Sequence, residues 1–267
     1  MSLTRGGGPL SGSPAGVANL DLSAHPGHAL YWEPYPRRVR GIVGDETLLD
    51  TQGGTLLHET GLLPVLYVPD ADLRADLLVP TDHHTVCPFK GVASYRSIRL
   101  PDRTVENAVW TYPDPLPGCP PISGYAGLYW SSLDHWYEED DELLGHVRDP
   151  YHRIDVRRSS RRVRVAWDGQ LLADSSRARL LHETGLPIRV YIPRDDLDLD
   201  QLESSDTVTV CPYKGVASHL SVRGAGDAGR DVAWEYPQPL AEAAEVRGHV
   251  AFYAEKVQVE VVPALPG

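Results

Sequence analysis

The sequence predicts a mainly β protein made of two tandem copies of one small domain, and three observations support this fold class. Glycine and proline are frequent, with 24 and 23 of the 267 residues, which disfavours long helices. The apolar segments are short and rich in β-branched residues that alternate with polar ones, as in half-buried strands. The same order of residues also recurs at a constant offset of 124 positions.

The repeat consists of matched blocks along most of the chain. Residues 37–40 recur as 161–164, 56–62 as 180–186, and 87–94 as 211–218. By direct count, about 38 of the 93 positions from 37 to 129 match without a gap. Solenoid repeats have periods of roughly 20 to 50 residues, so a period this long predicts that each copy is a complete domain.

Composition predicts how the chain is divided. A disordered lead is expected over residues 1–24, which are rich in glycine, serine and proline. The first copy is expected over 25–130 and the second over 151–262, with a tail at 263–267. Residues 131–150 contain the run EEDDE and are predicted to form an acidic linker.

Within the second copy, the order of elements follows from periodicity and turn residues. Residues 161–167 alternate and then reach Asp168-Gly169, a strong hairpin signal. Strands are also expected at 189–193, 207–210, 219–223 and 256–261. Helical turns are expected at 178–184, which Gly185 closes, and at 195–202. Each copy is therefore expected to be β with minor helix.

Charge and cysteine content exclude several classes of function. The formal charge is -12, which repels phosphate backbones and anionic lipid, so neither nucleic acid nor a membrane is an expected partner. No apolar stretch approaches the roughly 20 residues that cross a bilayer, and the N-terminal residues lack the apolar core of a signal peptide. The three cysteines lack Cys-x-x-Cys spacing, so we expect free thiols in the cytoplasm. No metal site and no cofactor are predicted.

The densest group of reactive side chains is the motif Cys-Pro-aromatic-Lys-Gly, which starts at Cys87 and again at Cys211. Proline and glycine at these offsets favour a tight turn that brings the thiol near Lys90 or Lys214. A nearby cation lowers the pKa of a thiol and makes the thiolate available as a nucleophile. The alternative is a buried cysteine that ends a strand beside a solvated lysine.

Aromatic and charged residues suggest a binding pocket in each copy. Trp110 and Tyr112, like Trp234 and Tyr236, are two positions apart and so share one face of an extended strand. With further tyrosines they could line a pocket for a flat or cationic ligand, although an aromatic core is the alternative for each one. Arg189 could bind an anion in the second copy only, because Val65 takes its place in the first. Glu59 and Glu183 are further candidate contacts, but Leu62 and Leu186 replace the second histidine of a His-Glu-x-x-His zinc motif.

The ordered blocks RVR, HETGLP, YIPRDD, TVCPYKGVAS, AWEYPQPL and GHVAFY resemble the bacterial and fungal family that is number 427 among the domains of unknown function. The resemblance covers residues 34–130 and 152–262, in the tandem form of the family. It implies a β-tent-like fold, the group that includes methionine sulfoxide reductase B and the thalidomide-binding domain of cereblon. Because the Cys-x-x-Cys pairs of that group are missing, the resemblance implies a zinc-free variant. The family also carries a nucleotidyltransferase label, but Asp198 and Asp200 are expected to face solvent.

The expected function is therefore the binding of a small molecule in a concave site of each domain. The residues expected to form these sites are Glu183, Arg189, Tyr191, Cys211, Lys214, Trp234 and Tyr236 in the second copy, and Tyr67, Cys87, Lys90, Trp110 and Tyr112 in the first. One alternative is an enzyme that uses Cys211 as a thiolate nucleophile with Lys214 beside it, or one with a nucleotidyltransferase-like activity. Another is a non-catalytic scaffold in which the copies form a pseudo-twofold dimer within one chain.

Overall fold

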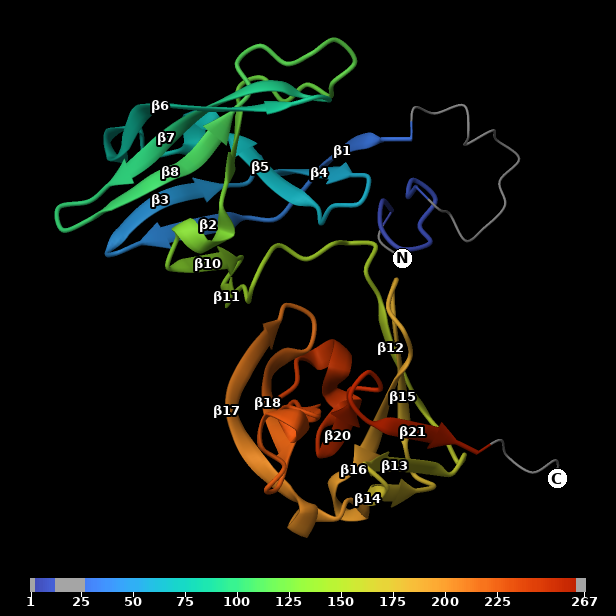
Figure 1. The fold of residues 1–267 in the computed structure, drawn as a ribbon. Coiled ribbons are helices and arrows are strands. Elements are labelled where there is room, and N and C mark those ends of the chain that lie inside the picture. Colours follow the sequence, from blue (N-terminus) through green and yellow to red (C-terminus); the bar gives the residue numbers. More distant parts are fainter. Residues whose placement is uncertain (1–2, 13–26, 263–267) are drawn as a thin grey trace. The chain divides into compact units, whose positions relative to one another are not determined.

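The structure is a computed structural model that describes residues 3–12 and 27–262 of the chain, which form two compact units with their boundary between Asp149 and Pro150 (Figure 1). The first unit holds the first copy of the repeat and the second unit holds the second. Both consist of antiparallel strands joined by turns and short 3₁₀ helices. The mainly β class and the two tandem copies are confirmed.

The first unit contains two open sheets. Its strands are β1 (Leu30–Pro34), β2 (Val39–Val43), β3 (Glu46–Thr51), β4 (Thr55–Glu59), β5 (Val65–Pro69), β6 (Leu78–Cys87), β7 (Gly91–Arg99), β8 (Thr104–Thr111), β9 (Tyr125–Leu128), β10 (His135–Glu138) and β11 (Asp141–Glu142). Its 3₁₀ helices are η2 (Asp70–Asp72), η3 (Ala75–Leu77) and η4 (Trp130–Ser132). The large sheet has the order β1, β4, β5, β9, β8, β7, β6, and the small sheet has the order β11, β10, β2, β3.

The second unit repeats this plan. Its strands are β12 (Ile154–Arg158), β13 (Val163–Trp167), β14 (Gln170–Ser175), β15 (Arg179–Glu183), β16 (Arg189–Pro193), β17 (Leu202–Cys211), β18 (Gly215–Val222), β19 (Ala233–Glu235), β20 (His249–Phe252) and β21 (Gln258–Val261). Its 3₁₀ helices are η5 (Arg194–Asp196), η6 (Leu199–Gln201), η7 (Gly226–Gly229) and η8 (Ala241–Val246). The large sheet runs β12, β15, β16, β20, β19, β18, β17, and the small sheet runs β14, β13, β21.

The central strands of the large sheet in the second unit contribute to a buried cluster on each face, and neighbouring residues along a strand point to opposite sides. In β16, Ile192 joins a core that also includes Val163 and Val165 of the small sheet. Its neighbour Tyr191 joins a second cluster on the other face, together with Trp234 of β19. The candidate binding residues of the second copy gather on this second face.

Two local expectations are wrong. Residues 178–184 were expected to form a helical turn, but residues 179–183 form β15, which pairs with β12 on one side and β16 on the other. Leu180 and Leu181 are both buried, and a short apolar run of this kind does not distinguish a helix from a strand. The supposed acidic linker contains β10, which pairs with β2 and buries Trp136. Residues 135–142 therefore belong to the first unit.

Other expectations concern turns and the N-terminus. The Asp168-Gly169 hairpin between β13 and β14 is confirmed, with φ angles of 46° and 78° at these two residues, and both belong to the left-handed region that hairpin turns require. The turn at 195–202 forms η5 and η6. Of the expected disordered lead, residues 1–2 and 13–24 lie outside the described part of the chain, as does the tail at 263–267.

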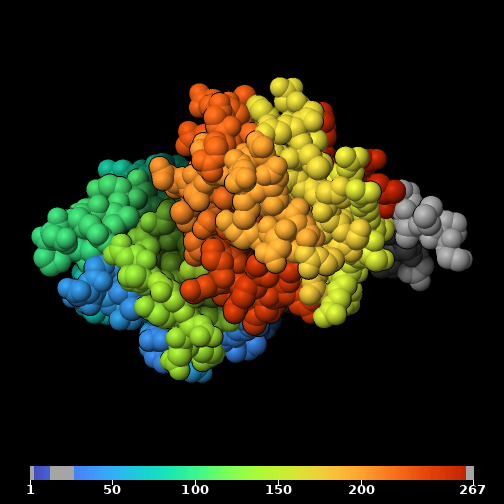
Figure 2. Space-filling view, turned by 90° about the horizontal axis from the view of Figure 1, so that it is seen from below, coloured from blue at the N-terminus to red at the C-terminus, as the bar shows by residue number. Residues whose placement is uncertain are grey.

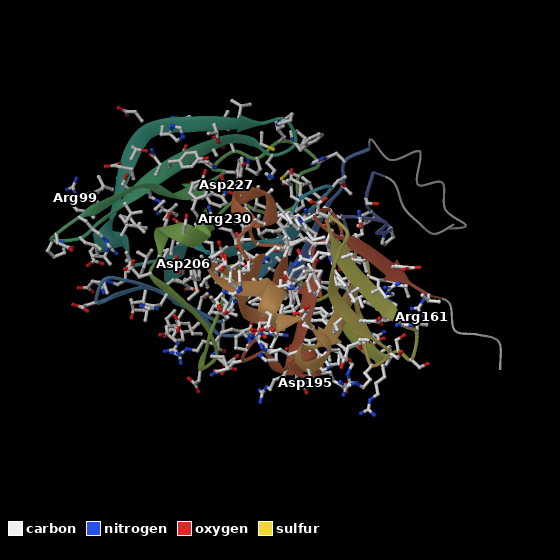
Figure 3. All side chains as sticks on the ribbon, turned by 60° about the horizontal axis from the view of Figure 1, so that its bottom comes forward. Arg99, Arg161, Asp195, Asp206, Asp227 and Arg230 are labelled. Carbon is white, nitrogen blue, oxygen red and sulfur yellow. The ribbon has the colours of Figure 1, made fainter. Side chains whose placement is uncertain are left out.

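Charged side chains cover the outside of the units. Arg161 lies just before β13, Asp195 lies in η5 and Asp227 lies in η7, and all three are exposed (Figure 3). Strand β17, at the edge of its sheet, is exposed in the space-filling view (Figure 2, orange). Among the residues that the structure describes, no helix has the length and apolar character needed to span a bilayer.

Candidate functional site

A buried ion pair lies at the edge of the second cluster in the second copy. Glu183 is the last residue of β15, and Lys214 lies in the turn between β17 and β18. The Nζ atom of Lys214 is 2.5 Å and 2.6 Å from the two carboxylate oxygens of Glu183. The Nε2 atom of His152, just before β12, is 3.1 Å from Oε1 of the same carboxylate. The Glu183 carboxylate is thus in hydrogen-bonding contact with both a lysine and a histidine.

The Cys-Pro-aromatic-Lys-Gly motif determines where Lys214 lies. Cys211 and Gly215 are cross-strand partners, and the Lys214 N–H donates to the Cys211 carbonyl at 3.3 Å, so the predicted tight turn is confirmed. Gly215 has a φ of +105°, and a Cβ atom there would lie 3.2 Å from the Gln238 carbonyl oxygen. A side chain is therefore strained at this position, and the glycine lets the turn direct Lys214 toward Glu183.

The electrostatics of the pair follow from its burial. The side chains of Glu183 and Lys214 are 6% and 9% exposed. Burial opposes ionisation of Glu183, but the hydrogen bond from His152 and the charge of Lys214 hold the pKa of this carboxyl below its ordinary value. The carboxylate stays charged, and the Lys214 ammonium has its own counter-ion.

The first copy contains the same arrangement. Lys90 donates to Glu59, and Nε2 of His28 is 2.9 Å from the Glu59 carboxylate. The two histidines also stack on the aromatic residue of the motif, with ring centroids 3.6 Å apart for His28 and Phe89 and 3.9 Å for His152 and Tyr213. Sequence reasoning missed His28 and His152, although the offset of 124 relates them. Extending the alignment toward the N-terminus would have found them.

The predicted aromatic residues of the second copy also meet. The indole N–H of Trp234 donates to the Tyr191 hydroxyl at 3.2 Å, and Tyr236 and Cys211 belong to the same cluster. Burial raises the pKa of Tyr191 and of Tyr236, so both phenols stay neutral. All four side chains lie on the face of the sheet that carries Glu183.

Arg189 lies above this cluster. Its guanidinium is 5.6 Å from the Trp234 ring centroid and donates to Glu255 at 3.2 Å. A guanidinium is attracted electrostatically to the face of an indole ring. Because Glu255 already supplies a counter-charge, the predicted anion contact would have to compete with that carboxylate.

The corresponding residues of the first copy also lie together. Trp110 donates to the Tyr67 hydroxyl at 3.2 Å, and Tyr112 and Cys87 pack in one cluster with Trp110. Burial raises the pKa of Tyr67 and of Tyr112. In both copies, therefore, the predicted aromatic residues are packed against one another, largely out of contact with solvent.

An open groove lies beside the end of β15 in the second copy. We call it the Glu183 groove; its volume is about 250 Å³ and it is lined by Arg153, Asp155, His182, Glu183, Thr184, Leu186 and Ile188. Leu186 and Ile188 are 55% and 54% exposed. The groove lies on the face of the sheet that carries His182 and Asp155 and combines an exposed apolar rim with charged side chains. The Glu183 carboxylate points to the opposite face, toward Lys214. Of the predicted site residues, it contains Glu183 alone.

Comparison with known protein families identifies the same two copies. The family described as a domain of unknown function, DUF427, matches the chain at residues 31–139 and again at 155–263. The chain belongs to the DUF427 family. Each match covers one copy and, in the first, includes β10 of the small sheet. No curated protein matches the chain.

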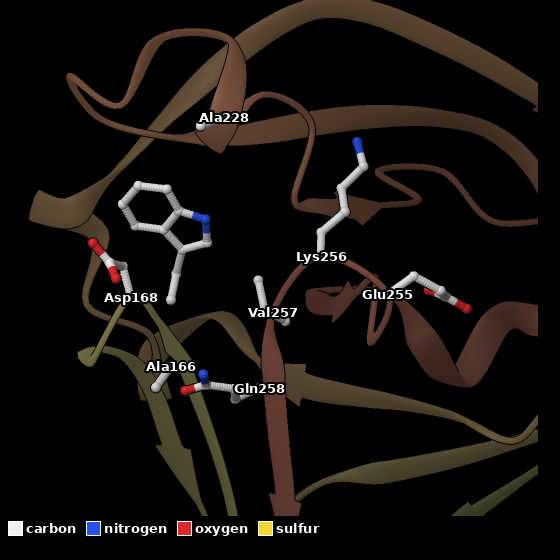
Figure 4. Close-up of a pocket in the computed structure, with 8 residues that line it drawn as sticks. Ala166, Asp168, Ala228, Glu255, Lys256, Val257 and Gln258 are labelled. Carbon is white, nitrogen blue, oxygen red and sulfur yellow. The ribbon is translucent and has the colours of Figure 1, made fainter.

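The second DUF427 copy has another groove on its small sheet. It measures about 610 Å³ and includes Trp167, Asp168, Glu255, Lys256 and Gln258 (Figure 4). Two of its charged groups, Lys256 and Glu255, are engaged within the chain. The Nζ atom of Lys256 donates to the Arg230 and Asp231 carbonyls at 3.0 Å, and Glu255 binds Arg189.

Over residues 3–12 and 27–262, no three His, Cys, Asp or Glu side chains are placed to hold one ion together. Asp198 and Asp200 of the DUF427 chain are exposed beside η6, as expected from the sequence.

Proposed function

We propose that this DUF427 protein binds a small molecule and that the Glu183 groove is its principal site. One observation carries the proposal: Glu183 belongs to the buried ion pair and also lines an open groove of about 250 Å³. Concave sites with an apolar surface and a few fixed polar groups are typical of ligand pockets. Here Leu186 and Ile188 supply the apolar surface, and the Asp155 carboxylate, which pairs with Arg153 and Arg157, supplies the fixed polar group.

The aromatic cluster has a supporting role in this proposal. The face of the sheet that carries the Glu183 side chain also carries Tyr191, Trp234 and Tyr236. Their packing holds β15, the strand that ends at Glu183, in place. Lys214 and His152 orient the carboxylate from two sides. A strand end that is held in one position loses little freedom on binding, which favours affinity.

The geometry favours binding over catalysis by Cys211. The expected role of Lys214 was to stabilise a thiolate, but both oxygens of Glu183 are within 2.6 Å of its ammonium. A lysine whose charge is already balanced has less effect on a neighbouring thiol. We therefore propose Lys214 as a residue that positions Glu183. We also propose a cytoplasmic location, which the three free cysteines support.

The test is a thermal-shift screen of a small-molecule library against the full chain and two variants. Leu186→Ser changes an exposed side chain of the groove, and Leu62→Ser makes the same change at the equivalent, 49% exposed position of the first copy. Compounds that stabilise the wild type should lose their effect in Leu186→Ser and keep it in Leu62→Ser. A screen whose hits respond equally to both variants would refute the proposal.

A further inference from the structure

In the first copy, the position equivalent to the Glu183 groove is bound by the chain's own N-terminal loop, residues 3–12. The loop is closed by a hydrogen bond from the Leu10 N–H to the Leu3 carbonyl at 2.8 Å. Two of its carbonyl oxygens receive donors from the first copy. The Gly61 N–H donates to Thr4 at 2.9 Å, and the Thr60 hydroxyl donates to Leu10 at 2.9 Å.

This contact is tight. Thr4 of this loop is fully buried. His58, two residues before Thr60, is also fully buried, whereas its equivalent His182 is exposed and lines the Glu183 groove. The Thr-Gly pair of the first copy therefore acts as a receptor for two main-chain carbonyl groups.

The second copy has the same pair of donors, and none of the described residues covers them as this loop does. Thr184 and Gly185 are the equivalents of Thr60 and Gly61, and the Arg153 N–H donates to the Thr184 hydroxyl at 2.8 Å, as the Ala29 N–H donates to Thr60 at 2.9 Å. The Thr184 hydroxyl turns back to the Arg153 carbonyl at 3.1 Å. Gly185 is exposed, and its N–H has no acceptor among the described residues.

We propose that the Glu183 groove takes a short peptide that presents two main-chain carbonyl oxygens, one to the Gly185 N–H and one to the Thr184 hydroxyl. This inference rests on the proposed function and names its ligand class. Binding needs only a rotation of the Thr184 hydroxyl, because the Arg153 carbonyl keeps the Thr184 N–H at 3.0 Å. Leu186 and Ile188 then contact the apolar side chains of the peptide.

The probe is a synthetic peptide of residues 3–12 with both termini blocked, titrated into the full chain labelled with ¹⁵N-glycine. The amide resonance of Gly185 should move and saturate, while that of Gly61, whose N–H is already bound, should stay in place. Thr184→Val removes the hydrogen bond to the peptide, together with the acceptor of the Arg153 N–H, and the lost peptide bond should weaken binding by about 2- to 12-fold. Thr184→Ser keeps the hydroxyl and should bind like the wild type. This control shows whether Thr184→Val binds weakly because of the missing hydroxyl or because the protein is unfolded.

Two results would overturn the inference, and both differ from a failure of the proposed function. If Gly185 does not respond to millimolar peptide in a protein whose groove still binds a screening compound, the ligand class is wrong and small-molecule binding stands. If Gly61 moves and Gly185 does not, the peptide displaces the chain's own loop and the assignment to the second copy is wrong. If neither compound nor peptide binds, the proposed function fails as well.

Discussion

Replacing Lys214 by methionine should destabilise the second copy by about 3–5 kcal/mol. Methionine fills a similar volume but leaves the Glu183 carboxylate, whose side chain is only 6% exposed, without its cation. Removing one partner of a buried ion pair typically costs this much, because the remaining charge is buried and uncompensated. An exposed pair would cost at most about 1 kcal/mol. The magnitude therefore reports whether the pair is as buried as the structure shows.

Urea denaturation of the full chain at pH 7, followed by tryptophan fluorescence, measures the change. Lys90→Met, at the matched position of the first copy, should cost a similar amount because Lys90 and Glu59 are equally buried. The double variant Lys214→Met/Glu183→Leu should recover most of the loss, since apolar replacement of a buried pair is often neutral or stabilising. The loss in Lys214→Met should also shrink as the pH falls, because Glu183 can then take up a proton. A loss below about 1 kcal/mol for Lys214→Met would refute this reasoning.

Three further outcomes follow from the structure. The lowered pKa of Glu183 stabilises the fold above the ordinary carboxyl pKa, and this contribution should be lost as the pH falls through the folded value, so the acid dependence of unfolding should be weaker in Glu183→Gln. Gly127→Ala places a Cβ atom 2.3 Å from the Trp110 ring and should cost about 1–3 kcal/mol in urea denaturation, whereas Ala251→Gly at the matched position should cost about 1 kcal/mol or less. Burial raises the pKa of the Cys119 thiol, so its alkylation by iodoacetamide, measured by mass spectrometry at pH 8, should be slower than that of free cysteine.

The duplication and most strands could be predicted because they depend on local pattern. A fixed offset and a period of two are visible in the residues themselves, and the Asp168-Gly169 hairpin needs only its own two residues. Pairing between strands that are far apart in the sequence could not be predicted from such a local pattern. Strand β10 pairs with β2, which is about a hundred residues away in the sequence. Trp136 is the buried residue of β10, but the acidic residues that follow it predicted a solvent-exposed linker.

The candidate site was predicted in part for the same reason. Motif spacing identified Lys214 and Glu183 separately, but their contact depends on β15 and the β17–β18 turn meeting at one edge of the sheet. The aromatic residues were predicted to line a pocket and instead pack together, because side-chain burial is decided by the whole sheet. The Glu183 groove depends on which rim residues stay exposed, and no sequence motif encodes that.

The most direct test of the account is the methyl NMR spectrum of the isoleucine-labelled full chain during titration with a compound from the screen. Ile188 lines the Glu183 groove and is replaced by Pro64 in the first copy, while Ile192 of β16 is fully buried in the core. The account predicts that the Ile188 methyl resonance moves in a saturable way and that the Ile192 resonance does not. A compound that binds the wild-type chain while Ile188 stays unmoved would contradict it.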